Sequence, residues 1–301
     1  MGKETLNSRK NDQGSINLFL ICSGLIIYNT SKRLLIKKLG LVLNGLGLIN
    51  ILSSYTINKN KVRLIFYGGS REKNLDGSIN KIGVSDNSAF YFAAKNTIVG
   101  YKDFKFTGQL IKIKDSIQLV DKINSQNDGS IHTLDILSHG TPYSLNFSLI
   151  KNENCGLYSS KLAKKAVELY YTFSGFEWYV FSQFSRDLNA INYNKFAFDA
   201  RIEIHGCNAA NDLNLPLDTF VEKLSIYLYQ SNKRHSVVIG HLTKATPKIN
   251  GSSTQVKEQD YRHGLRGVFH NGDLLFTTNI KGVIAYSDIQ KKLKEKLKND
   301  Y

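Results

Sequence analysis

The fold of this chain is decided by Leu134-Asp135-Ile136-Leu137-Ser138-His139-Gly140 and by Arg201-Ile202-Glu203-Ile204-His205-Gly206-Cys207-Asn208. The first stretch is typical of a strand that ends in Ser-His-Gly, and the second of a strand that ends in Gly-Cys. Each therefore places a reactive side chain where a strand stops and a loop begins. In α/β sheets, ligands bind and catalytic residues lie at such strand ends. If the two strands are parallel neighbours, His139 and Cys207 meet at one edge of the sheet.

Around these two stretches, short β-branched strands alternate with helices, a pattern that predicts an α/β sandwich with a largely parallel sheet. The expected strands are 62–67, 132–138, 201–205 and 236–240, followed by a hairpin over 267–277 that turns at Asn271-Gly272. The expected helices are 86–99, 116–125, 159–171, 176–188, 217–230 and 287–298.

The first 60 residues differ from the rest, and we expect them to form an N-terminal apolar region before a main domain of residues 61–301. Two apolar stretches, Ile16–Tyr28 and Leu39–Leu52, are both shorter than the ~20 residues that span a bilayer as a helix. They predict a helical hairpin packed on the main domain, with a membrane-associated element as the alternative. No small-x-small site follows the first stretch, so we expect no cleavable signal peptide.

Composition and charge limit the compartment and the partners. The 301 residues contain three cysteines, an odd number of widely spaced thiols that favours a reducing, cytoplasmic compartment or delivery into a target cell. The formal charge of +15 permits weak contact with anionic membranes or nucleic acid through a basic surface. Lysine runs such as Lys291–Lys294 are equally typical of a solvated helix face. No helix-turn-helix accompanies the charge.

The chemistry suggested by the two strand ends is that of a thiol and an imidazole. Taken alone, a free cysteine is more often a buried structural residue, and a lone histidine at a strand end is more often a hydrogen-bonded surface group. Cys22 and Cys155 keep that structural interpretation. Cys207 and His139 occupy matching strand ends, where together they could form a nucleophile with its acid–base partner.

Strand-Ser-His-Gly followed later by strand-Gly-Cys resembles the caspase-like cysteine peptidases, which include caspases, metacaspases, gingipains, clostripain and the self-processing domains of large bacterial toxins. The resemblance covers about residues 61–245 and is closer to the bacterial members, although the Gln-Ala-Cys signature of caspases is missing. It implies a caspase-like three-layer sandwich and a cysteine endopeptidase that acts on a protein or peptide substrate. Such a chain would be a bacterial effector or toxin, or a self-processing domain.

Carried over by residue, the resemblance implies that Cys207 attacks the scissile carbonyl and that His139 protonates the leaving amine and then activates water. The backbone N–H groups of Gly140 and Cys207 would stabilise the oxyanion. The candidates for lining the substrate pocket are Ser138, His205, Asp212, Asp260, Arg262 and Arg266. Asp212 and Asp260 would suit a basic substrate side chain, and Arg262 or Arg266 an acidic one.

Two other functions remain open. All seven histidines lie between His132 and His270, which allows a basic nuclease that uses this cluster with or without a metal. No carboxylate-rich spacing completes a metal site, so the sequence predicts neither metal nor cofactor. A catalytically inactive caspase-like module that only binds its partner is the third possibility.

Overall fold

The structure is a computed structural model of the chain, and it describes residues 17–21, 24–28, 61–68, 89–100, 107–147, 156–173, 185–212 and 216–299. The chain divides into two compact units, residues 1–60 and residues 61–301. No helix within the described ranges is long and apolar enough to cross a membrane.

The first unit contains two strands, β1 (Asn17–Ile21) and β2 (Gly24–Tyr28), which pair antiparallel. The helix expected over Ile16–Tyr28 is therefore wrong over these residues. β1 contains Phe19 and Ile21, and β2 contains Ile26, Ile27 and Tyr28, residue types that fit a pleated strand better than a helix. The second stretch of the expected helical hairpin, Leu39–Leu52, lies outside the described residues.

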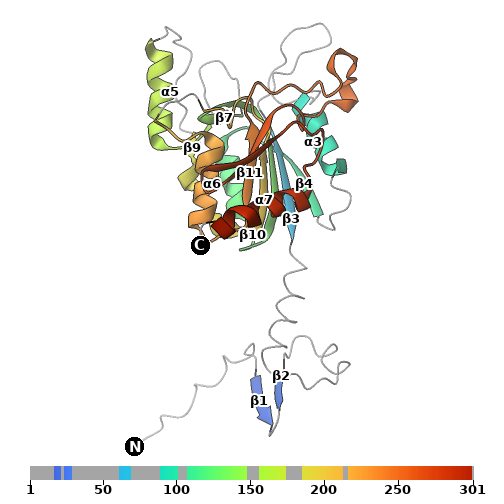
Figure 1. The fold of residues 1–301 in the computed structure, drawn as a ribbon. Coiled ribbons are helices and arrows are strands. Elements are labelled where there is room, and N and C mark those ends of the chain that lie inside the picture. The colour runs from blue at the N-terminus through green and yellow to red at the C-terminus, as the bar shows by residue number, and fades with distance from the viewer. Residues whose placement is uncertain are drawn as a thin grey trace, which may run out of the picture. The chain divides into compact units, whose positions relative to one another are not determined.

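The second unit is built on a seven-stranded mixed sheet with the order β13-β12-β11-β10-β5-β3-β4 (Figure 1). The strands are β3 (Val62–Tyr67), β4 (Thr107–Lys112), β5 (Ile131–Leu137), β10 (Phe196–Ile204), β11 (Val237–His241), β12 (Arg266–His270) and β13 (Asp273–Thr278). Neighbours from β11 to β4 run parallel, whereas β12 and β13 are antiparallel. The predicted α/β class with a mostly parallel sheet is confirmed.

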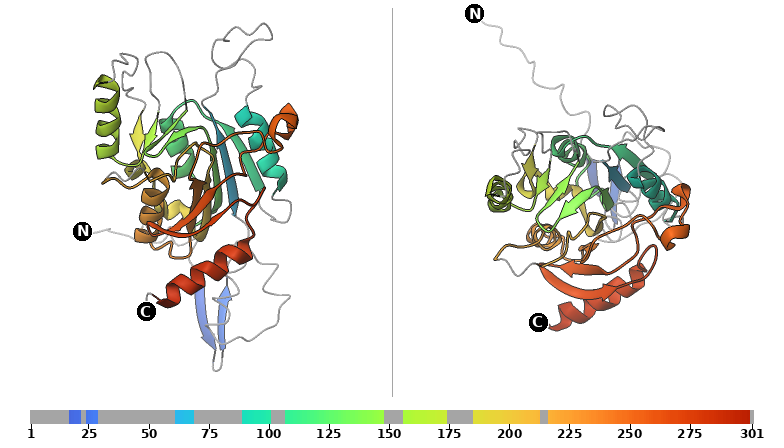
Figure 2. Two further views of the ribbon diagram at one scale, coloured as in Figure 1. Left: turned by 45° about the horizontal axis from the view of Figure 1, so that its top comes forward. Right: turned by 90° about the horizontal axis from the view of Figure 1, so that it is seen from above.

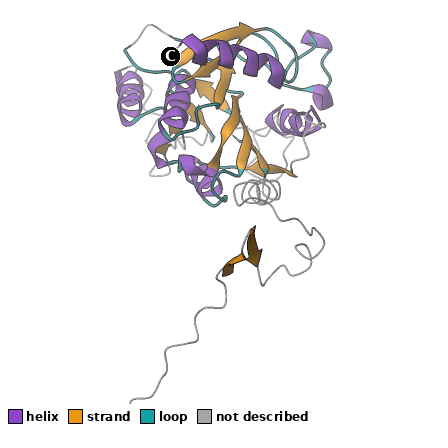
Figure 3. Ribbon diagram, turned by 60° about the horizontal axis from the view of Figure 1, so that its bottom comes forward, coloured by secondary structure: helices purple, strands orange, loops and turns teal. Residues whose placement is uncertain are grey.

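Helices cover both faces of this sheet, as Figures 2 and 3 show. The helices are α3 (Ala89–Gly100), α4 (Ser116–Asn124), α5 (Lys161–Phe173), α6 (Phe220–Gln230) and α7 (Tyr286–Asn299). Buried residues of α4 and α6 pack with those of β3, β5 and β10 in the largest apolar cluster. Buried residues of α3 and α7 pack on the opposite face in two smaller clusters.

A smaller sheet with the order β6-β7-β8-β9 continues from the end of β5. Its strands are β6 (His139–Thr141), β7 (Ser144–Asn146), β8 (Leu157–Tyr158) and β9 (Arg186–Asp187). The helix expected over 176–188 is wrong over the part that the structure describes, from residue 185 onward, because β9 lies there. There the Asp187 carboxylate accepts from the Asn189 N–H and caps a single 3-10 turn, Leu188–Ala190, in place of an α-helix.

Candidate active site

The two strand ends singled out in the sequence lie side by side. β5 and β10 are parallel neighbours, with Asp135 opposite Glu203 and Ile136 opposite Ile204. The ladder continues one step further, because the His205 N–H donates to the Ile136 carbonyl over 2.9 Å. The prediction that both strands end at the same edge of the sheet is confirmed.

Two glycines bring the loops after these strands into backbone contact. A Cβ atom built on Gly140 would lie 2.8 Å from the Cα atom of Gly206, and one built on Gly206 would lie 3.0 Å from the Cα atom of Gly140. Neither position has room for a side chain, so the two glycines are required by the close approach. Because each glycine adjoins a candidate catalytic residue, this contact holds the backbones of His139 and Cys207 together.

Cys207 lies at a sharp turn and is partly exposed. The next residue, Asn208, has a φ of 56°, a left-handed conformation that asparagine adopts more readily than most residues. Its N–H donates to the Thr243 carbonyl over 3.1 Å. The Cys207 thiol donates to the Ala245 carbonyl over 3.5 Å and is not hydrogen-bonded to His139. The segment after β11 therefore lies against the thiol.

His139 is exposed and packs against an aromatic pair. Its ring meets the ring of Phe90 edge-on at a centroid distance of 5.2 Å, and Phe90 stacks on Tyr261 at 5.3 Å. Ala245, which accepts from the thiol, packs on the same cluster. Burial, and secondarily the negative charge that Cys207 can carry, raises the pKa of Tyr261, so its phenol stays protonated. Phe90, Ala245 and Tyr261 carry no signal in the sequence, because helix α3 and two loops bring them together only in the folded chain.

Beneath the strand ends lies a group of buried charges. His205 Nε2 is 3.1 Å from Asp135 Oδ1, and the two Glu203 oxygens accept from Arg201 over 2.8 Å and from Arg266 over 2.5 Å. Burial alone would raise the pKa of Glu203, but the two guanidinium groups outweigh it and hold that pKa well below its usual range. Glu203 is therefore a carboxylate at any working pH.

Asp135, Glu203 and His205 also form the one group of possible metal ligands found among the described residues, with ligand atoms within 4.8 Å of one another. The donor set fits a cation poorly, since both Glu203 oxygens already accept from guanidinium groups. Among the described residues, Asp135 Oδ2 and His205 Nδ1 are buried without a hydrogen-bond partner. From the sequence, no carboxylate-rich spacing was found to complete a metal site. The alternation of Arg201, Glu203 and His205 along one side of a strand was the available signal.

The remaining predicted pocket residues are placed as follows. Ser138 is buried, and its hydroxyl donates to the His139 carbonyl over 3.1 Å. Asp260 and Arg262 are buried and paired, with N···O distances of 2.6, 3.0 and 3.2 Å, and Arg262 also donates to the Asn96 carbonyl on α3. Arg266 is buried against Glu203. Asp212 is exposed, in contrast to the others.

No protein-family model, curated protein or solved structure matches this chain.

Proposed function

We propose that this chain is a cysteine endopeptidase with a caspase-like fold, in which Cys207 and His139 form the catalytic dyad. The observation that carries the proposal is the contact of the Gly140 and Gly206 backbones at the shared end of β5 and β10. This contact places a partly exposed thiol and an exposed imidazole on adjoining peptides of one sheet edge. The proposed biological role is that of a bacterial effector or toxin, or of a self-processing domain.

In the proposed reaction, the Cys207 thiolate attacks the scissile carbonyl, and the N–H groups of Gly140 and Cys207 face the developing oxyanion. Each such donor contributes roughly 3 kcal/mol to transition-state stabilisation. His139 takes up the proton of the Cys207 thiol, passes it to the leaving amine, and then removes a proton from the water that hydrolyses the thioester. The thiol must leave the Ala245 carbonyl before it attacks, so substrate binding has to displace that hydrogen bond.

The buried charges guide the choice of substrate pocket. Asp260, Arg262 and Arg266 are all matched by charged partners inside the protein, and using any of them to bind substrate would cost that pairing. Asp212 is exposed and follows the Cys207 turn by five residues. Because Asp212 is the exposed member of the candidate set, we propose it as the pocket charge, which would favour substrates with a lysine or arginine before the scissile bond.

The decisive experiment is a peptide-library cleavage profile of the full chain against Cys207→Ala and His139→Ala. We expect each substitution to lower kcat by at least about 1000-fold, as for other nucleophile and base removals. His235→Ala is the matched control, because His235 precedes β11 at the opposite edge of the sheet and packs on Phe198. Full cleavage by Cys207→Ala, with an unchanged profile, would refute the proposal.

The thiol–carbonyl hydrogen bond favours a second candidate, an inactive caspase-like module that binds without cleaving. A Cys207 thiol that resists iodoacetamide at neutral pH would support it, whereas rapid alkylation that slows in His139→Ala supports the peptidase.

The nuclease has less support. Its Asp135, Glu203 and His205 ligands are each about 1% exposed, so phosphate groups cannot reach them. Nuclease activity that a chelator abolishes would reverse this ranking.

A further inference from the structure

Helix α5 lies at the edge of the domain (Figures 1 and 2), and two of its leucines are exposed. The side chain of Leu162 is 62% exposed and that of Leu169 is 57% exposed, although most other large apolar residues of the described part are buried. They are seven residues apart, which stacks them two turns apart on one side of the helix. A cluster of exposed leucines on one helix face is typical of a surface that contacts an apolar phase.

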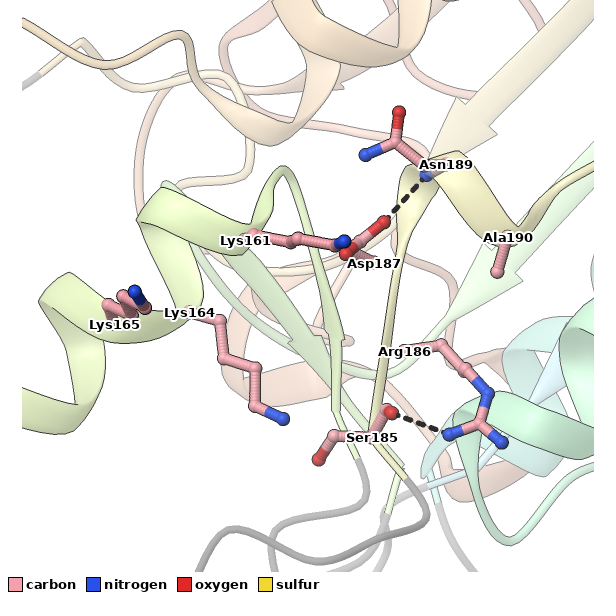
Figure 4. Close-up of a pocket in the computed structure, with 8 residues that line it drawn as sticks. All are labelled: Lys161, Lys164, Lys165, Ser185, Arg186, Asp187, Asn189 and Ala190. Atoms are coloured by element: carbon pink, nitrogen blue, oxygen red, sulfur yellow. Dashed lines mark hydrogen bonds between the residues drawn. The ribbon is translucent and has the colours of Figure 1, made fainter.

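The same helix supplies the cations of a cavity of about 550 Å³. Lys161, Lys164 and Lys165 line it from α5, and β9 supplies Arg186 and Asp187 (Figure 4). The lining thus has four cations and one carboxylate. The carboxylate already accepts from the Asn189 N–H over 2.9 Å. The cavity lies at the first turns of α5, where the helix dipole adds a positive field. It suits the phosphate of a small anionic group.

Leucines and lysines share one side of α5. At about 100° per residue, the sector from Lys164 through Lys161, Lys165 and Leu169 to Leu162 covers about 160° of the helix. The opposite side is anchored to the domain by Ala163, which is fully buried. By the same spacing Glu168 also falls in this sector, between Lys164 and Lys161, so the face has three lysines against one glutamate and stays cationic overall.

We propose that this face of α5, with the cavity beside it, is a peripheral binding surface for membranes that contain anionic phospholipid. Leu162 and Leu169 would enter the boundary between headgroups and acyl chains, and the cationic cavity would take a headgroup phosphate. Nucleic acid fits less well, because the lining residues that the structure describes include no aromatic side chain on which a base could stack, and the leucines would stay in water. The proposal does not depend on the peptidase activity.

The test is sedimentation of the full chain with vesicles of phosphatidylcholine alone and of phosphatidylcholine containing phosphatidylserine. We expect binding to the mixed vesicles only, and weaker binding as salt rises. Lys161→Gln/Lys164→Gln/Lys165→Gln should lower the partition coefficient roughly 100-fold, given the usual gain per lysine at an anionic surface. Leu162→Ser/Leu169→Ser should lower it by roughly tenfold or more at unchanged charge.

Matched controls separate this surface from the general basic charge of the chain and from its first 60 residues, which every variant retains. Lys291→Gln/Lys294→Gln/Lys298→Gln removes three exposed charges from α7, and Leu274→Ser/Ile280→Ser removes two side chains that are 49% and 48% exposed. Both controls should bind like the wild type. The proposal is wrong if they lose as much affinity as the α5 variants, or if the α5 variants bind normally. Binding of pyrophosphate that needs Lys164, without vesicle binding, would show a soluble phosphate site and would also overturn it.

Discussion

The two faces of the central sheet are built on different principles. On the face that packs against α4 and α6, β3, β5 and β10 present only apolar side chains to the core, among them Leu64, Leu134 and Ile202. On the opposite face, the same strands carry charged or polar residues between the clusters of α3 and α7. These residues are Arg63, Thr133, Asp135, Arg201, Glu203 and His205. One face is held by apolar burial alone, and the other by two smaller apolar clusters with matched buried charges between them.

The difference shows what the charged face requires. Arg201 donates to the Ile284 carbonyl over 2.8 Å, and Arg266 donates to the carbonyls of Ile280 and Gly282. The chain that leads into α7 therefore closes over the guanidinium groups and supplies carbonyl acceptors to both of them. Buried charges of this kind cost desolvation energy, so they stabilise the fold only while all partners are present. The stability of the apolar face does not depend on such partners.

The largest expected effect comes from breaking the charged face at its centre. Glu203→Gln leaves the guanidinium groups of Arg201 and Arg266 buried without their counter-charge, and we expect it to lower the free energy of unfolding by roughly 3–5 kcal/mol. Urea unfolding monitored by circular dichroism measures this loss. The wild-type contribution of Glu203 should also vanish in acid. Because its folded pKa is depressed, that contribution is complete above about pH 4.3 and is lost as the pH falls below it.

The adjacent residue gives the matched comparison. Ile202 is fully buried on the apolar face, and Ile202→Ala should cost roughly 2–5 kcal/mol through the lost transfer energy and the cavity. That cost should be the same at pH 7 and pH 4, because no charge is involved. If the Glu203→Gln loss were equally independent of pH down to strong acid, the charge-matching account of that face would be wrong.

A smaller effect is expected at His241, which is buried on β11 beside the charged group. Burial, followed by the charges of His205 and Arg266, lowers the pKa of His241 to about 3, although Glu203 acts in the opposite direction. The unfolded chain takes up a proton near pH 6.5 and the folded one does not, so stability is greatest above that value and falls between about pH 6.5 and 3. At pH 5 the loss amounts to about 2 kcal/mol.

His241→Gln removes the imidazole that titrates. The quantity to measure is the difference in unfolding free energy between this variant and the wild type. The variant should be less stable at pH 7.5, and the gap should narrow by about 2 kcal/mol at pH 5. A gap that stays constant over this range would show that His241 is not held neutral by its surroundings.

The same contrast explains how much of the molecule could be predicted from the sequence. The strands over 62–67 and 236–240 were predicted closely, because both are apolar or β-branched runs. The turn at Asn271-Gly272 was also predicted closely, and its two residues have φ values of 50° and 85°. The edge strand β4 was missed because Thr107-Gly108-Gln109 lacks a strand pattern. At the site, matching strand ends predicted the neighbourhood of His139 and Cys207.

The partners of the charged residues could not be predicted in this way. Glu203 and Arg266 are 63 residues apart and meet only because β10, β11 and β12 are consecutive in the sheet. Asp260 and Arg262 bear opposite charges two residues apart, and the sequence alone favoured neither a substrate role nor their mutual pairing. Long-range register decides contacts such as that of Glu203 with Arg266, and periodicity along the chain contains no information about it.

The smallest expected effect is at the N-terminus of α6, on the apolar face of the sheet. Helix α6 begins with a capping box, in which Thr219 accepts from the Glu222 N–H over 3.3 Å and the Glu222 carboxylate accepts from the Thr219 N–H over 2.7 Å. Thr219→Ala removes one half of this box and should cost about 1 kcal/mol of unfolding free energy. Since α6 packs through Phe220, Leu224 and Leu228 on the apolar face, this cost should not change between pH 5 and 8. A cost that grows in that range would mean that titrating groups also hold α6, and the two faces would no longer be separable.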